Sequence, residues 1–186
     1  MVAGDIVETE DFTKFVESQQ KTEVETEIFW AEQRDEWLKD LDSLYARIAD
    51  FLQEYIEGGS ISYAFTEIEV TEPEIGEYSA KGMDIKIGRQ HVSLVPIGTV
   101  LVASKGRVDV VGSAGRAQIL LVDERVRSAA DLIRVTVSMK DTAPAPPARI
   151  PSISWTWKIL TNALQKRFVD LDKESFFALL MEIANA

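Results

Sequence analysis

The feature that most constrains this chain is a series of short apolar segments separated by turns every eight or nine residues. Between residues 61 and 122, apolar and polar residues alternate, as they do in half-buried strands. Connections this short cannot hold a crossover helix, so consecutive strands must pair as antiparallel hairpins. The predicted strands span residues 61–70, 83–87, 91–95, 99–103, 107–111 and 117–122, and their turns lie at 88–90, 96–98, 104–106 and 112–115.

Two further strands are predicted toward the carboxyl terminus. Residues 133–139 alternate in the same way, and Trp155 and Trp157 share one face of a later strand. We predict that both tryptophans belong to the core, with a stacking platform for a ligand as the alternative. The first strand changes phase between Phe65 and Ile68, which predicts a β-bulge.

A long helix is predicted before the strands, from Thr26 to Glu57. Its apolar residues recur at spacings of three and four, no Gly or Pro interrupts them, and Gly58 with Gly59 forms a natural end. The spacing also suits a coiled coil, but the stripe is wide and lasts less than three heptads. We therefore predict packing on the protein's own sheet, with a homodimer through the long helix as the alternative.

Two shorter helices are predicted near the carboxyl terminus, after a proline-rich loop at residues 141–152 that excludes helix and central strand. The first helix passes through Leu160 and Leu164, and the second begins near Asp172, a suitable N-cap. The predicted fold class is α+β: a long N-terminal helix packed on a curved antiparallel β-meander or small barrel, with two C-terminal helices.

The first residues differ in composition from the rest of the chain. Residues 1–24 have few large apolar side chains and many Glu, Thr and Gln, which predicts an acidic arm that is disordered or loosely docked. Residues 25–186 are predicted to form a single α+β domain. The sequence has no cysteine, no basic-apolar signal segment and no apolar run of the roughly 18 residues that a membrane span needs. We expect a cytoplasmic protein without a membrane partner.

Charge is unevenly divided along the chain. Residues 1–57 carry 16 acidic and 5 basic side chains, whereas residues 78–149 carry 11 bases and six acids. The acidic third is the solvated face of a helix, a surface for a basic partner, or an arm that folds over a basic patch. Nucleic acid is not an expected partner, because neutralising phosphates requires exposed positive charge.

An aspartate on one strand, followed by an acid and a base on the next, resembles the way many metal-dependent nucleases place their ligands. Asp109, Asp123 and Arg125 follow that order, and Glu54 on the long helix could help. However, a hairpin turn at 112–115 places Asp109 opposite Gln118, so Asp123 lies five residues further along, about 17 Å away. Two carboxylates that far apart cannot bind one metal ion. We predict neither a metal site nor catalytic residues here.

Four basic residues form the candidate site. In a meander, alternate turns lie at the same end of the sheet, so the predicted turns at 88–90 and 104–106 would share one end. This would gather a cluster that could bind an anion or an acidic partner, although solvated turn residues are the alternative. The predicted binding residues are Lys86, Arg89, Lys105 and Arg107.

These patterns favour a non-catalytic interaction protein, such as an adaptor, accessory or regulatory module that binds another macromolecule, most simply a protein. A metal-dependent hydrolase or nuclease, intact or degenerate, is the alternative. A binder of a phosphorylated small ligand at the basic turns is a third hypothesis. No cofactor is predicted, since no phosphate-binding loop or dinucleotide fingerprint occurs in the sequence.

Overall fold

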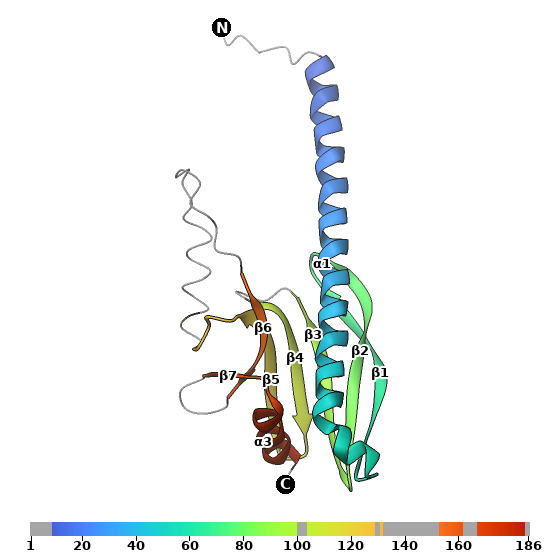
Figure 1. Cartoon of the computed structure of the whole chain (residues 1–186). Helices are drawn as coiled ribbons and strands as arrows, with labels where there is room; N and C mark the ends of the chain where they lie inside the picture. The colour runs from blue at the N-terminus through green and yellow to red at the C-terminus, as the bar shows by residue number, and fades with distance from the viewer. Residues whose placement is uncertain (1–8, 100–103, 129–130, 132–152, 162–166, 185–186) are drawn as a thin grey trace.

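A seven-stranded antiparallel sheet is the centre of the computed structural model, which describes residues 9–99, 104–128, 131, 153–161 and 167–184. Each strand pairs with its neighbour in the chain, in the order β1-β2-β3-β4-β5-β6-β7, so the sheet is a simple meander. It is open and curled, with β1 at one edge and β7 at the other (Figure 1). The strands are β1 (Ile61–Glu72), β2 (Gly76–Ile87), β3 (Gln90–Gly98), β4 (Ser104–Gly112), β5 (Gly115–Asp123), β6 (Trp155–Leu160) and β7 (Phe168–Asp170).

Two helices pack against the sheet, α1 (Thr9–Glu57) and α3 (Lys173–Ala184). The lower part of α1 lies beside α3, where the rings of Phe51 and Phe176 are 6.2 Å apart. Their apolar faces join the inner face of the sheet in one hydrophobic core, which includes residues of both helices and of strands β1 to β6. The upper part of α1 extends beyond the sheet (Figure 1).

The predicted fold class is confirmed in its main features: a long N-terminal helix, a curved antiparallel sheet and helical structure at the carboxyl terminus. The predicted N-cap is also confirmed, because the Asp172 carboxylate accepts a hydrogen bond from the Ser175 N–H at 2.7 Å. The count of two C-terminal helices is not matched. Leu160 ends β6 instead of entering a helix, and Leu164 lies outside the described residues.

The long helix is longer than predicted, because it begins at Thr9 instead of Thr26. The part of the predicted arm that the structure describes, residues 9–24, is therefore helical and continuous with the rest of α1. The division into an arm and a domain of residues 25–186 stays a prediction. The proline-rich loop at 141–152 and the predicted strand at 133–139 lie outside the described residues.

The predicted turn at 96–98 is wrong. Pro96 lies inside β3, opposite Val108, and β3 continues to Gly98. The pairing register shifts between Pro96 and Gly98, which is a setting where a sheet tolerates proline. The predicted strands 91–95 and 107–111 are therefore direct neighbours, with no strand between them. Of the predicted strand 99–103, the structure describes only Thr99, which is not part of a strand.

The predicted bulge in the first strand is also wrong. β1 and β2 pair without a register shift from Ile61 opposite Ile87 to Glu72 opposite Gly76. The burial still changes phase, because Phe65 is half exposed while Val70 is buried. Two-stranded ribbons twist more strongly than wide sheets, so a long hairpin can turn its other face inward without an extra residue.

Candidate functional site

The four basic residues of the predicted cluster are not brought together. Lys86 and Arg89 lie at the β2–β3 turn, where Lys86 pairs with His91. Lys105 and Arg107 lie at the start of β4, and Arg107 pairs with Gly98 at the far end of β3. The error follows from the turn at 96–98, because removing one predicted turn moves every later turn to the opposite end of the sheet. The predicted gathering of these four residues is therefore wrong.

Two of the four cations are used inside the chain. The Lys105 ammonium lies 3.1 Å from the Glu36 carboxylate and 2.9 Å from that of Asp40, both on α1. Burial lowers the pKa of Lys105, but the hydrogen bonds to Asp40 and Glu36 outweigh it and raise that pKa above its ordinary value. Arg107 binds the buried carboxylate of Asp109 through two nitrogens, at 2.6 and 2.9 Å. These cations stabilise the fold where they lie.

The geometry that argued against a metal site is confirmed by the strand register. Asp109 lies opposite Gln118, whereas Asp123 ends β5 and lies opposite Trp155. Asp123 binds its neighbour Arg125, and mainly the hydrogen bond from that guanidinium lowers the pKa of the carboxyl to about 2. Within the described residues, no three His, Cys, Asp or Glu side chains come close enough to hold a metal ion.

A buried lysine that sequence reasoning missed lies next to this region. Lys158 of β6 is fully buried, and its ammonium donates to the carbonyl oxygens of Glu124 and Val126 at 2.8 and 2.9 Å. It also lies 3.1 Å from the Asp170 carboxylate. The alternation along β6 cannot reveal this, because the oxygen ligands come from a turn about 30 residues earlier in the chain. Lys158 ties that turn to the sheet.

The two tryptophans of β6 differ in burial. Trp157 is buried in the core, with its ring 6.0 Å from that of Trp37, as predicted. Trp155 is 39% exposed, so the prediction that it belongs to the core is wrong. It lies opposite Asp123 at the end of the β5–β6 pair, where each strand has its terminal residue.

Trp37 is the first residue along α1 that is buried in the core. Its ring lies against Gly106, where an added Cβ would come within 2.0 Å of a ring carbon, so only glycine leaves room for it. Beside it, the Tyr78 hydroxyl donates to the buried Glu72 carboxylate, which also accepts from the Thr99 N–H at 2.8 Å. Burial, and then the hydrogen bond to Glu72, raise the pKa of Tyr78. This packing gives α1 a defined attachment.

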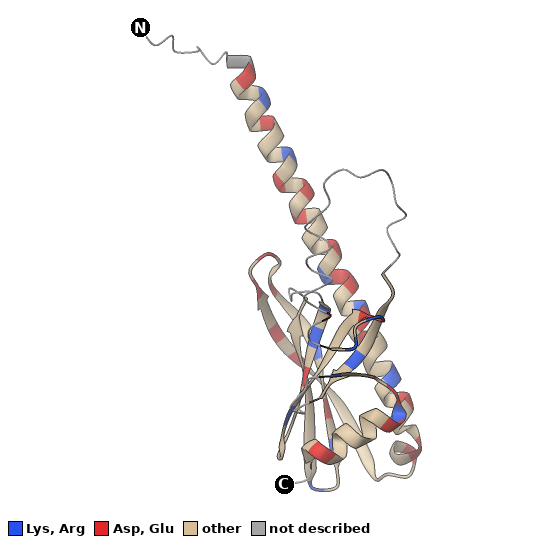
Figure 2. Cartoon of the chain, turned by 90° about the vertical axis from the view of Figure 1, so that its left-hand side faces the viewer, with Lys and Arg blue, Asp and Glu red and all other residues tan. Residues whose placement is uncertain are grey.

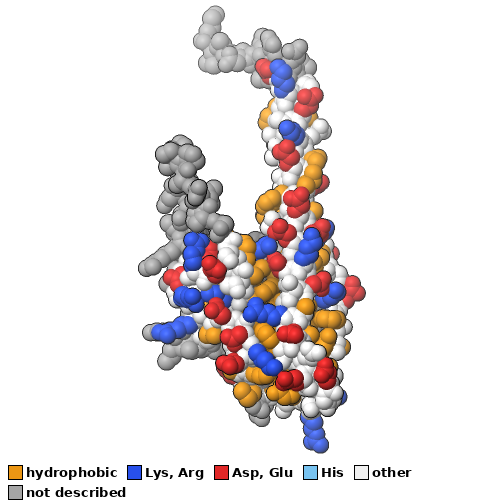
Figure 3. All heavy atoms as spheres, viewed as in Figure 1, with side chains coloured by type: hydrophobic (Ala, Val, Ile, Leu, Met, Phe, Trp, Pro, Cys, Tyr) orange, Lys and Arg blue, Asp and Glu red, His pale blue; other side chains and the backbone are white. Residues whose placement is uncertain are grey.

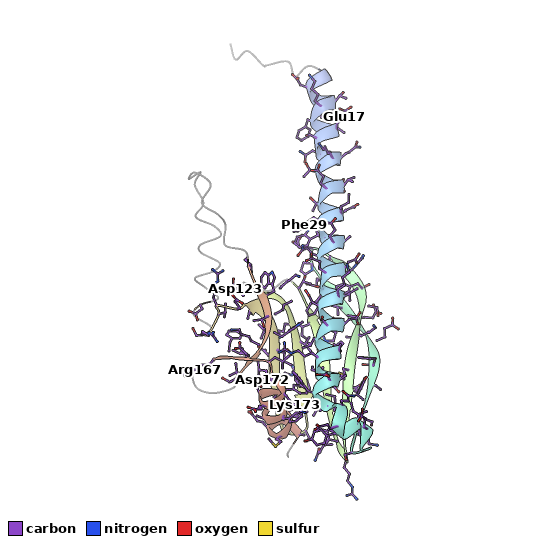
Figure 4. All side chains as sticks on the ribbon, in the orientation of Figure 1. Glu17, Phe29, Asp123, Arg167, Asp172 and Lys173 are labelled. Carbon is purple, nitrogen blue, oxygen red and sulfur yellow. The ribbon has the colours of Figure 1, made fainter. Side chains whose placement is uncertain are left out.

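Before Trp37, α1 has a stretch in which every residue is exposed. We call residues 11–29 the extension. Each of its 19 residues is exposed, and at 1.5 Å per residue it is about 28 Å long. Figure 4 marks Glu17 and Phe29 on it, and Figure 3 shows apolar side chains between its charged ones. Its exposed large apolar residues are Phe12, Phe15, Val16, Val24, Ile28 and Phe29.

Much of this apolar surface continues the face of α1 that is buried on the sheet. Each residue of an α-helix is rotated by about 100° around the helix axis from the residue before it. Viewed down the axis of α1, the core residues Trp37, Leu41, Leu44 and Ile48 therefore lie within one arc of about 140°. The same arc on the extension contains three exposed aromatic residues, and it leads to Trp30, whose ring is 5.0 Å from that of Phe29. We call this surface the continued face; it consists of Phe12, Phe15, Val16, Gln19, Thr22, Glu23, Thr26, Phe29 and Trp30.

The charges of the extension lie mainly outside the continued face. The extension carries five acidic and two basic residues; Glu23 lies within the face, and Asp11 lies at its edge, in line with Phe29. Lys14 and Lys21 lie on the opposite side of the helix, by the same count of about 100° per residue. Figure 2 shows acidic residues distributed along the length of α1. The extension is thus an acidic helix with one aromatic, weakly charged face.

Sequence reasoning described residues 1–24 as poor in large apolar side chains and missed the register of those that are present. Between Val16 and Phe29 the continued face carries Gln19, Thr22 and Thr26, which interrupt the apolar period. The signal that could have revealed it is the spacing back from Trp37, in steps of three and four residues, to Phe12.

Comparisons with known proteins do not extend this description. A scan of protein-family models found no match, and searches of curated proteins and of solved structures found no similar chain. Among the described helices, none combines the length and apolar character needed to cross a membrane.

Proposed function

We propose that this protein is a non-catalytic interaction module, and that it binds a protein partner through the continued face of the extension. The observation that carries the proposal is that one face of α1 is buried in its second half and exposed on the extension. From Trp37 to Leu52 that face is buried on the sheet, whereas Phe12, Phe15 and Phe29 on the extension are 50 to 59% exposed. Aromatic side chains dominate binding energy at protein interfaces, because they bury large areas in few conformations.

The attachment of the extension supports an adaptor or accessory role. Trp37, packed against Gly106 and Trp157, fixes the direction in which α1 leaves the domain. A partner bound to the extension would therefore be held at a defined orientation to the sheet. The sequence contains no cysteine, which suits a reducing compartment, and the proposal retains the cytoplasmic location.

A photocrosslinking experiment in cells tests the proposal. Benzoylphenylalanine replaces Phe15 on the continued face in one full-length variant and Lys21 on the opposite side in a second. We expect a discrete adduct from position 15, little from position 21, and loss of the first adduct when Phe12 and Val16 are both replaced by serine. Equal labelling at the two positions, or none at position 15, would show that the continued face binds no partner.

The same experiment includes the homodimer predicted from the helical spacing. An adduct containing two copies of this chain would identify the partner as a second molecule of the protein. An adduct with one copy of another protein would identify a heterologous partner. Mass spectrometry of the crosslinked peptides separates these outcomes.

A further inference from the structure

We infer that the surface that covers the extension is basic: a helix or groove of another protein whose apolar centre is bordered by lysine or arginine. This inference rests on the proposed function and specifies the chemistry of the partner. The reason lies in how the chain itself covers the rest of α1, and in which acids of the extension lack a cation.

The docked part of α1 shows which groups its acids bind. Lys105 of β4 contacts Glu36 and Asp40, at 3.1 and 2.9 Å. Two further lysines make the same kind of contact: Lys81 of β2 lies 2.9 Å from Asp42, and Lys173 of α3 lies 3.6 Å from Glu54. Wherever these elements cover α1, an apolar contact is thus bordered by a lysine.

On the extension, the acids near the continued face have no such cation. Glu23 lies in the face and Glu27 at its border, and neither takes part in an ion pair with any described residue. The two lysines of the extension instead pair with acids about one helical turn away, Lys14 with Asp11 at 4.0 Å and Lys21 with Glu25 at 3.8 Å. A covering surface therefore meets uncompensated negative charge at Glu23 and Glu27.

This charge pattern disfavours a second copy of the chain as the molecule that covers the continued face. Charged residues that border a helix–helix seam select the partner, because like charges repel across it. The charges nearest to the continued face are acidic, and two of them, Glu23 and Glu27, form no ion pair with a described residue. In a parallel pair in register, two copies would bring Glu23 and Glu27 of one chain beside the same residues of the other. A partner with basic borders would instead attract both sides of the face.

Two synthetic helical peptides test the inference with the full-length chain. Both carry the same leucine stripe, bordered by lysines in one peptide and by glutamates in the other. Fluorescence anisotropy at low salt should show that the lysine peptide binds at least about tenfold more tightly, and that 0.5 M salt removes most of this difference. A Glu23→Lys, Glu27→Lys double variant should lose about tenfold in affinity for the lysine peptide.

A matched control separates position from net charge. Glu17→Lys with Glu32→Lys changes the total charge by the same amount on the opposite side of α1, so it should retain most of the affinity. Equal binding of the two peptides, no binding of either, or equal losses in both double variants would show that the inference is wrong.

The experiments distinguish an error about the basic character of the partner from an error about the continued face as an interface. If Phe12→Ser with Val16→Ser abolishes the crosslink from position 15 while Glu23→Lys with Glu27→Lys leaves it unchanged, the face binds a partner that is not basic. If the chain sediments as a dimer that the Phe12→Ser, Phe15→Ser variant dissociates, the occupant is a second copy. Either result overturns the basic partner and leaves the continued face as the interface.

Discussion

The two parts of α1 differ in what covers them more than in which residues they contain. From Trp37 to Leu52 the helix buries a continuous stripe against the sheet and α3, and lysines outside the helix bind its acids. From Asp11 to Phe29 the same helical face carries aromatic residues, neutral polar ones and Glu23, and every residue is exposed. One helix therefore has a part whose stability comes from packing and a part that depends on local interactions alone.

This difference in burial implies a difference in helix stability. Most of the stability of a helix within a protein comes from burying one face, and an isolated helix of this length is marginal in water. The extension contains β-branched residues and phenylalanines of modest helix propensity, such as Thr22, Val24 and Ile28. A covering partner would supply the missing burial, so binding and stabilisation of the helix should occur together.

Amide hydrogen exchange should show the largest difference between the docked part of α1 and the extension. Amides near Leu44 and Ile48 should exchange only through global unfolding, at least about a thousandfold slower than a free peptide. Amides near Val16 and Lys21 should exchange within about tenfold of the free-peptide rate, because only local helix opening is needed. Equal protection of both parts in the isolated chain would contradict the distinction between a docked part and a free extension.

Replacing Trp37 tests the docked part. Trp37→Ala removes a fully buried ring that packs on Gly106 and Trp157, so the free energy of unfolding should fall by about 3–5 kcal/mol. The matched variant Phe29→Ala, on the same face of the extension, should change it by less than about 0.5 kcal/mol. Urea denaturation followed by circular dichroism measures both, and similar losses would show that the extension is docked as well.

The ion pairs of Lys105 have a smaller effect that depends on pH. Lys105→Met should reduce stability by about 1 kcal/mol at neutral pH, since the pairs are partly exposed. Because the folded-state pKa of Lys105 is raised, its contribution is complete below the ordinary value of 10.5 and is lost as the pH rises through the higher folded value. The difference in unfolding free energy between Lys105→Met and wild type should therefore narrow at high pH. The control Lys39→Met, at an exposed position of α1, should stay near the wild-type stability throughout.

Truncation should have the smallest effect. Among the residues that deleting 1–20 removes, residues 11–20 are all exposed, so the melting temperature should shift by no more than about one or two degrees. Differential scanning calorimetry of the truncated and full-length chains measures this shift. A decrease of many degrees in the melting temperature would show that the first residues pack against the domain, and would contradict the description of the extension as free.

The helix and the hairpins could be predicted because their signals are local. Spacings of three and four along residues 37–55 and alternation in the strands report directly which face is buried. Pro96 misled the prediction, because a proline next to a register shift can remain within a strand, and that single residue moved Lys105 and Arg107 to the wrong end of the sheet. The burial of Lys158 was not predictable, because its ligands are backbone oxygens brought near only by the tertiary fold.

The strictly sequential order of the strands has a consequence for the rate at which this protein folds. The β4–β5 hairpin closes through the two residues Ser113 and Ala114, whereas joining β6 to β5 must close a loop of residues 124–154. Loop closure costs about 0.6 kcal/mol more for each doubling of length, so the second step costs roughly 2–3 kcal/mol more in chain entropy. We expect β1 to β5 to assemble quickly from neighbouring hairpins, and β6, β7 and α3 to join them in a later, slower step.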